Sequence, residues 1–175
     1  MSDNDSTRSS RPLDSEALER IAFHYVARYA TSSAKLRSYL QRKLRTRGVV
    51  DGFGGDVAAI VEKMVELGFV NDAAYAEMQA SSLTRRGYGA RRIDVALRQA
   101  GIAETVSRDL TSVAEGVGVE TAHSYAKRRR LGPYSAKSPS RDERQRVIAA
   151  LMRAGHCLDD ARAVIIDWRE GRGDS

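Results

Sequence analysis

The sequence has few residues of the kinds that crosslink a chain or interrupt helices. Its single cysteine, Cys157, excludes an internal disulfide framework. Only three prolines occur in 175 residues, and aromatic residues make up 6%, so the core must be built from Leu, Val, Ile and Ala. The sequence shows neither a secretory signal nor an apolar run long enough to span a membrane. We therefore expect a helical, cytoplasmic protein.

Patterns typical of catalysis and metal binding are also lacking. The three histidines, His24, His123 and His156, are scattered, and only His156 adjoins the cysteine. Neighbouring residues of a helix point to different sides, which is a poor arrangement for a shared metal ion. No serine stands in a nucleophile-elbow pattern, and no carboxylate pair has an evident purpose. We expect no enzymatic activity, no catalytic residue, no cofactor and no metal site.

Positive charge, in contrast, is abundant and unevenly spread. Lys and Arg number 29 against 23 Asp and Glu, which gives a formal charge of +6. From Arg20 to Val50 there are eight basic residues and no acidic one. A second basic cluster surrounds Gly87, and a third is the run 127–130. These clusters favour a polyanionic partner, which is a nucleic acid, a nucleoprotein or an acidic protein surface.

The candidate contact residues are basic side chains away from the expected apolar faces, together with one tyrosine. Arg91 and Arg98 are seven residues apart, so they share one side of their helix, roughly opposite Ile93 and Leu97. Tyr88 lies in a glycine turn, where it either stacks on a partner or fills the gap between helices. The full set is Arg37, Arg42, Arg45, Arg85, Arg86, Tyr88, Arg91, Arg92, Arg98, Lys127, Arg128, Arg129 and Arg130.

A repeat runs through the chain. The pattern apolar-x3-Leu-x3-Gly ends at Gly48, Gly101 and Gly155, at intervals of 53 and 54 residues. The helices that follow carry apolar residues at i, i+4 and i+7: Ile60/Met64/Leu67, Val106/Leu110/Val113 and Ala161/Ile165/Trp168. A three-helix unit of this size buries little on its own, so we expect tandem copies stacked into an elongated, curved array.

We therefore predict an all-α fold of three tandem, helix-turn-helix-like repeats with three helices each. The repeats cover residues 14–68, 69–116 and 117–168, between a disordered N-terminal tail at 1–13 and a disordered C-terminal tail at 169–175. The segment 31–33, Asp56 and Asn71 supply N-caps for three of the helices.

The tyrosines of the first repeat are assigned to its core. Tyr25 and Tyr29 fall on the apolar stripe of a first helix expected over residues 15–30. Tyr39 faces inward from the second helix by the same periodicity.

Four segments occur in a specific order and spacing. They are Ala27–Ser32, Leu40–Gly48, Leu67–Ala76 and Arg85–Ile93, and together they span most of residues 20–101. In this order they resemble the RecX family, the regulatory proteins of the bacterial RecA recombinase. The resemblance implies three tandem three-helix repeats that lodge in the helical groove of the RecA–DNA filament. It also implies modulation, mostly inhibition, of recombinase, ATPase and co-protease activity in DNA repair and the SOS response.

The resemblance names the RecA filament as the partner of the basic clusters, with single- or double-stranded DNA as a further candidate. We expect a monomer without membrane contact. The residues alone leave two other functions open. One is an independent helix-turn-helix-like DNA-binding protein, because the same charge would serve it. The other is a helical scaffold whose charge only keeps it in solution.

Overall fold

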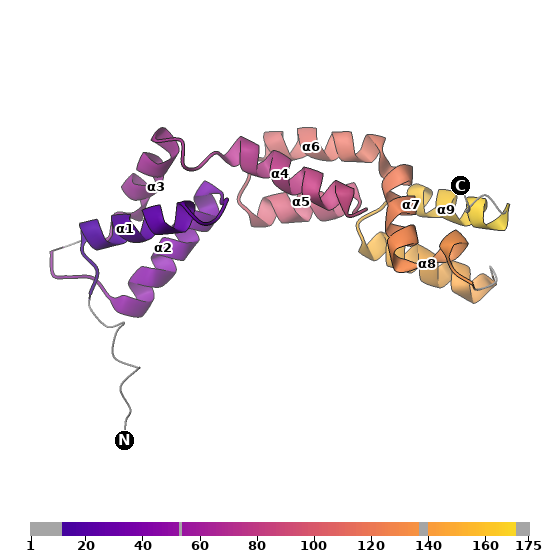
Figure 1. Ribbon diagram of the computed structural model, residues 1–175, viewed down its shortest axis with the longest axis horizontal. Helices are drawn as coiled ribbons and strands as arrows, with labels where there is room; N and C mark the ends of the chain where they lie inside the picture. The colour runs from indigo at the N-terminus through magenta and orange to yellow at the C-terminus, as the bar shows by residue number, and fades with distance from the viewer. Residues whose placement is uncertain (1–11, 53, 137–139, 171–175) are drawn as a thin grey trace, which may run out of the picture. The chain divides into compact units, whose positions relative to one another are not determined.

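The computed structural model describes residues 12–170, apart from 53 and 137–139, and over these residues it contains helices and no strand. The all-α fold predicted from the sequence is confirmed. The helices are α1 (Ser15–Val26), α2 (Ser33–Arg47), α3 (Val57–Glu66), α4 (Asp72–Arg85), α5 (Ala90–Gln99), α6 (Glu104–Gly116), α7 (Gly118–Arg129), the short 3₁₀ helix η1 (Gly132–Tyr134), α8 (Arg141–Arg153) and α9 (Leu158–Arg169) (Figure 1).

The chain forms two compact units, unit 1 (residues 1–75) and unit 2 (residues 76–175). Unit 1 holds α1, α2, α3 and the first residues of α4, whereas unit 2 holds the rest of α4 and the helices that follow. The boundaries of the three expected repeats and their elongated, curved arrangement stay predictions.

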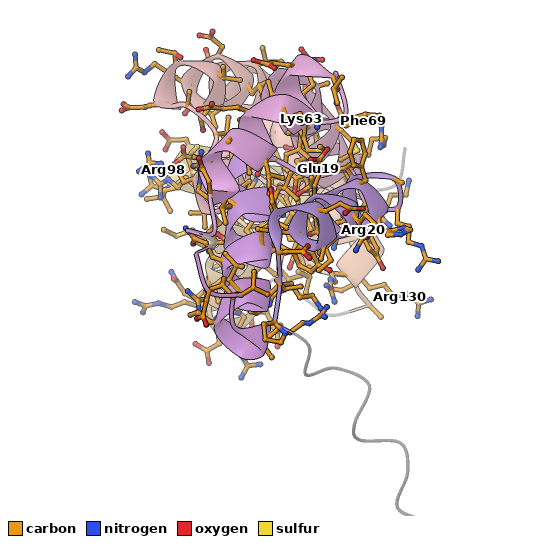
Figure 2. The ribbon with its side chains drawn as sticks, turned by 90° about the vertical axis from the view of Figure 1, so that its left-hand side faces the viewer. Glu19, Arg20, Lys63, Phe69, Arg98 and Arg130 are labelled. Atoms are coloured by element: carbon orange, nitrogen blue, oxygen red, sulfur yellow. The ribbon has the colours of Figure 1, made fainter. Side chains whose placement is uncertain are left out.

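Unit 1 is a three-helix bundle whose helices begin at local capping signals. Asp14, Ser32 and Asp56 precede α1, α2 and α3, and each accepts the backbone N–H of the residue three positions later. The expected caps at residues 31–33 and at Asp56 are thereby confirmed. Leu and Val side chains fill most of the core, and an ion pair between Lys63 and Glu19 joins α3 to α1 at the surface (Figure 2).

The start of unit 1 differs from expectation in two places. Leu13 is fully buried, and its backbone N–H and carbonyl pair with Gly48 and Val50 at 3.0 and 3.1 Å. The disordered tail expected over 1–13 therefore does not include Leu13, and residues 1–11 lie outside the described residues. The helix expected over 15–30 ends at Val26, so Tyr29 is not on a helical stripe and its side chain is 57% exposed.

The apolar seam predicted for α5 is confirmed, because Ile93, Leu97 and Ala100 are buried and α5 packs against α6. The stripe predicted for α6 is wrong at Val113, which is 72% exposed, whereas Val106 and Leu110 are half-buried. The small residues Ser107 and Ala114 are buried instead. The Ser107 hydroxyl donates to the Asp94 carboxylate of α5 at 3.1 Å, and this bond fixes which side of α6 faces α5.

Helices α7, α8 and α9 pack around a separate cluster of buried residues in unit 2 (Figure 1). This cluster consists of Ala, Val, Leu and Ile. The helix α9 extends through Arg169, and the N–H of Glu170 still bonds to Ile166. The disordered tail expected over 169–175 therefore does not include Arg169 and Glu170. Residues 171–175 lie outside the described residues.

Candidate anion-binding surface

Two of the three basic clusters meet within unit 2. The end of α4 and the last turn of α7 are adjacent, because the Arg128 guanidinium donates to the Arg85 carbonyl at 3.1 Å. An open hollow lies beside this contact. We call it the arginine–tyrosine surface, and its lining residues are Arg86, Tyr88, Tyr125, Arg128 and Arg129.

Aromatic rings hold the cations of this surface in place. The ring centroids of Tyr88 and Tyr125 are 5.7 Å apart. The Arg86 guanidinium lies 5.1 Å from the Tyr88 centroid, and the Arg129 guanidinium lies 5.8 Å from that of Tyr125. A guanidinium that contacts a ring through its face keeps the N–H donors at its edge for a carboxylate or a phosphate. The surface is therefore suited to binding anions.

Glycine at position 87 permits this assembly. Its φ is +79°, and a Cβ atom there would lie 2.6 Å from the Tyr125 backbone nitrogen. Because a side chain would push α7 away, only glycine allows the turn after α4 to approach α7 this closely. Tyr88 consequently reaches the Tyr125 ring.

The same turn is bonded to the turn between α8 and α9. Gly89 N–H donates to the Ala154 carbonyl and Arg91 N–H donates to the Gly155 carbonyl, both at 3.1 Å. We call this contact the turn joint, and define it as residues 87–91 and 154–156. It fixes the distance between the α4–α5 turn and the C-terminal helices, and thereby the shape of the arginine–tyrosine surface.

His156 closes the turn joint from the inside. Its side chain is buried, and its Nε2 lies 2.9 Å from the Gly87 carbonyl oxygen. Burial lowers the pKa of His156 below its ordinary value, although the Gly87 carbonyl and the Asp160 carboxylate act in the opposite direction. Its burial and its contact with the Gly87 carbonyl give His156 a structural role in the turn joint, whereas the sequence pattern shows only its position beside Cys157.

Of the predicted contact residues, those of the second and third clusters come together. Arg85, Arg86, Tyr88, Arg128 and Arg129 all belong to the surface or its edge. Tyr88 is half-buried, so it both fills the gap between helices and lines the hollow. Tyr125 was missed by the sequence analysis. It occupies an apolar position of α7, and no local signal marks it as part of a site.

Arg91 and Arg98 are on a different part of unit 2. Arg98 pairs with Asp94 at 2.9 Å, and both arginines line a second hollow that also contains Glu104 and Glu115. The mixed charge of that hollow makes it a weaker anion site than the arginine–tyrosine surface. In Figure 2, Arg98 projects on the side of the view opposite Arg130, the last residue of the third cluster.

The remaining predicted residues are exposed. Lys127 lies 5.9 Å from the Tyr134 ring centroid, and Arg130 ends α7 in the left-handed conformation. Arg92 directly follows the residues of the turn joint, and a Cβ at Gly155 would be 2.5 Å from its nitrogen. The α2 residues of the set, Arg37, Arg42 and Arg45, belong to unit 1.

Comparison with known proteins places the chain in a family. The family model described as RecX, second three-helix domain, matches residues 71–109. The regulatory protein RecX of Myxococcus xanthus is 37% identical over 163 residues, which are 89% of this chain and 87% of that protein. This chain belongs to the RecX family. The RecX of Mycobacterium sp. strain JLS is 30% identical over 166 residues, which cover 91% of this chain and 89% of that protein.

The fold is likewise shared with a solved RecX structure. The crystal structure of RecX from Lactobacillus salivarius matches with a TM-score of 0.67 at 18% identity, over 89% of this chain and 96% of that chain. The residues matched by the RecX second-domain model include the turn 86–91, which carries the first half of the arginine–tyrosine surface. Within the described ranges, no helix has the length and apolar character needed to cross a membrane.

Proposed function

We propose that this RecX-family protein binds the RecA–DNA nucleoprotein filament and modulates, mostly inhibits, its recombinase, ATPase and co-protease activity in DNA repair and the SOS response. The arginine–tyrosine surface is the observation that carries the proposal. It presents Arg86, Arg128 and Arg129 around one open hollow. A nucleoprotein filament offers both phosphates and carboxylates, and arginine pairs with either. That the relatives are named regulatory proteins supports a partner of this kind.

The first experiment measures single-strand-dependent ATP hydrolysis by the cognate RecA, titrated with this protein below one-to-one. We expect wild-type protein to reduce turnover. For the triple variant Arg86→Glu, Arg128→Glu and Arg129→Glu, at least about tenfold more protein should be needed for the same reduction in turnover. Each substitution removes a proposed bond between a guanidinium and a phosphate or carboxylate of the filament.

A matched triple variant separates local contacts from net charge. Arg108, Arg146 and Arg162 are exposed, and each pairs with a carboxylate on its own helix. Reversing these three to Glu lowers the formal charge from +6 to zero, as the first triple variant does. We expect this control to inhibit nearly as well as wild type. Equal loss in both variants, or no loss in the first, would remove the arginine–tyrosine surface from the contact.

The same titration, together with a measurement of binding to bare duplex DNA, tests the alternative of an independent DNA-binding protein. Tight binding to bare duplex DNA together with unchanged RecA turnover would favour that alternative. It would also limit the family resemblance to the fold.

A further inference from the structure

Unit 1 contains a row of three tyrosines that runs from the edge of its core to the surface. The Tyr25 and Tyr39 rings are stacked with centroids 4.1 Å apart and planes 21° apart, and the Tyr29 centroid lies 5.3 Å from that of Tyr25. We call this row the tyrosine ladder (Tyr29, Tyr25, Tyr39). Tyr25 and Tyr39 pack against the core with part of their surfaces, but the Tyr29 side chain is 57% exposed. The ladder therefore ends in an aromatic ring open to solvent.

Cations stand at the other end of the ladder. The Arg42 guanidinium lies 5.6 Å from the Tyr39 ring centroid, and the Lys43 ammonium lies 5.4 Å from it. Both are on α2, in the stretch from Arg20 to Val50 that has eight basic residues and no acidic one. The three ladder tyrosines therefore lie in a segment whose charged side chains are all basic.

An exposed ring at one end of the ladder and two cations at the other end favour one class of ligand. An unpaired nucleobase offers a flat π-face to the ring, and its phosphates offer negative charge to the basic residues. A base inside a duplex is already stacked on both faces, so the ring cannot use it. An acidic peptide would satisfy Arg42 and Lys43 but would leave the Tyr29 ring in water.

We propose that the tyrosine ladder is a stacking site for the unpaired bases of single-stranded nucleic acid. One base stacks on the open ring of Tyr29, and a strand that continues along the ladder brings its phosphates toward Arg42 and Lys43. The site belongs to unit 1 and uses none of the residues of the arginine–tyrosine surface. It requires no recombinase, so it stands independently of the function proposed above.

The test measures binding of the full-length protein to a fluorescent oligothymidylate of about 15 nucleotides, by anisotropy and without RecA. The variant Tyr29→Ala should bind at least about fivefold more weakly than wild type, because it loses one base–aromatic contact. The variant Tyr29→Phe should bind like wild type, since it keeps the ring. A strand of equal length and charge without bases should bind wild type as weakly as oligothymidylate binds Tyr29→Ala.

Phe69 supplies the matched control. It is an aromatic residue of the same unit, labelled in Figure 2, with a similar exposure of 52%. Its ring contacts the Phe23 ring edge-to-face at 5.4 Å, and it is not one of the ladder tyrosines. Phe69→Ala should leave binding unchanged. Thermal melting by circular dichroism verifies that each variant is folded. If Tyr29→Ala melts early, Tyr29→Leu keeps the apolar bulk without the ring and should show the same loss of binding.

Four outcomes of these binding measurements would contradict the stacking proposal. Wild-type affinity in folded Tyr29→Ala or Tyr29→Leu overturns the proposal, as does an equal loss in Phe69→Ala or tight binding of the strand without bases. A ribonucleotide strand of the same sequence tells whether the ladder binds DNA or RNA. The type of strand whose affinity falls in Tyr29→Ala is the type that stacks on the ring, and a fall with neither strand overturns the proposal. Failure here leaves the RecA proposal intact, since no recombinase is present in the assay.

Discussion

At the scale of single residues, the most informative side chain in unit 2 is His156. A buried polar group is tolerated when it is hydrogen-bonded, and the Gly87 carbonyl oxygen lies 2.9 Å from its Nε2. Its burial between two turns means that protonation would place a charge inside the turn joint. The groups that act on it also include the Asp160 carboxylate and the Gly118 backbone, and the Tyr125 ring centroid lies 6.3 Å from that of the imidazole.

His156 predicts how stability depends on pH. Burial lowers its pKa in the folded protein, so the unfolded chain binds the proton at a higher pH than the folded chain does. The stability that His156 contributes is therefore fully present above its ordinary pKa of about 6.5 and decreases as the pH falls through that value. We expect the urea midpoint to fall between about pH 7.5 and about pH 5.5, and to fall less in His156→Gln. An equal fall in both proteins would assign the pH dependence to other groups.

At the scale of elements, the turn joint depends on close backbone contact. A Cβ atom at Gly89 would lie 2.4 Å from the Gly155 carbonyl carbon and 2.5 Å from the His156 nitrogen. Backbone atoms at this distance cannot move aside individually, so the two turns would have to separate. The residues of the joint thus have little freedom even though Gly89 itself has an ordinary φ of −79°.

We therefore expect Gly89→Ala to lower the free energy of unfolding by about 1–3 kcal/mol, as overpacking substitutions do. Gly116→Ala is the control, because a Cβ at this last residue of α6 meets nothing within 4 Å. It should leave stability unchanged or raise it by up to about 1 kcal/mol. Urea unfolding monitored by circular dichroism measures both changes. Equal stability of the two variants would show that the turns separate without cost.

The elements also show which features the sequence can predict. The starts of α2 and α3 were predictable because Ser32 and Asp56 act on residues three positions away. The α6 stripe was predicted wrongly because periodicity counts Val113 as inward, whereas the buried Ser107 bonds to a residue on another helix. The contact of His156 with Gly87 spans 69 residues, and no local pattern carries that information.

Part of the candidate site could likewise be predicted from the sequence, and part could not. The clustering of arginines around Gly87 and at residues 127–130 is visible in the sequence, and their meeting is not. Their meeting depends on the close approach of Gly87 to the Tyr125 backbone, which only the packed structure shows. Tyr29 was assigned to the core because a continued helix was assumed, and the end of α1 at Val26 removes that assumption.

At the scale of the whole molecule, the division between the two units falls within α4. The Asn71 side chain accepts the Ala74 N–H at 2.9 Å, as expected of an N-cap, and the match to the RecX second domain begins at the same residue. Asp72 in turn accepts the Ser33 N–H at 2.7 Å within unit 1. The first turn of α4 therefore serves both as the start of a helix and as a contact of unit 1.

This position predicts where the chain can be cut. A fragment of residues 71–175 keeps the α4 cap, and we expect it to unfold cooperatively in urea. A fragment of residues 76–175 loses that cap and the first turn of α4, and should be less stable by about 1 kcal/mol or more. Circular dichroism of the two fragments measures the difference. Unfolding of the longer fragment without a cooperative transition would show that unit 2 depends on unit 1.

The turn joint determines which amino-acid substitutions this part of the protein can tolerate. Its bonds at Gly89 and Arg91 use backbone atoms only, so they are indifferent to almost every side chain around them. To keep the joint, the protein needs glycine at positions 87, 89 and 155, where a side chain would not fit, and the His156 imidazole that contacts the Gly87 carbonyl. Substituting the arginines around the joint would then change what the surface binds and leave the backbone bonds of the joint in place.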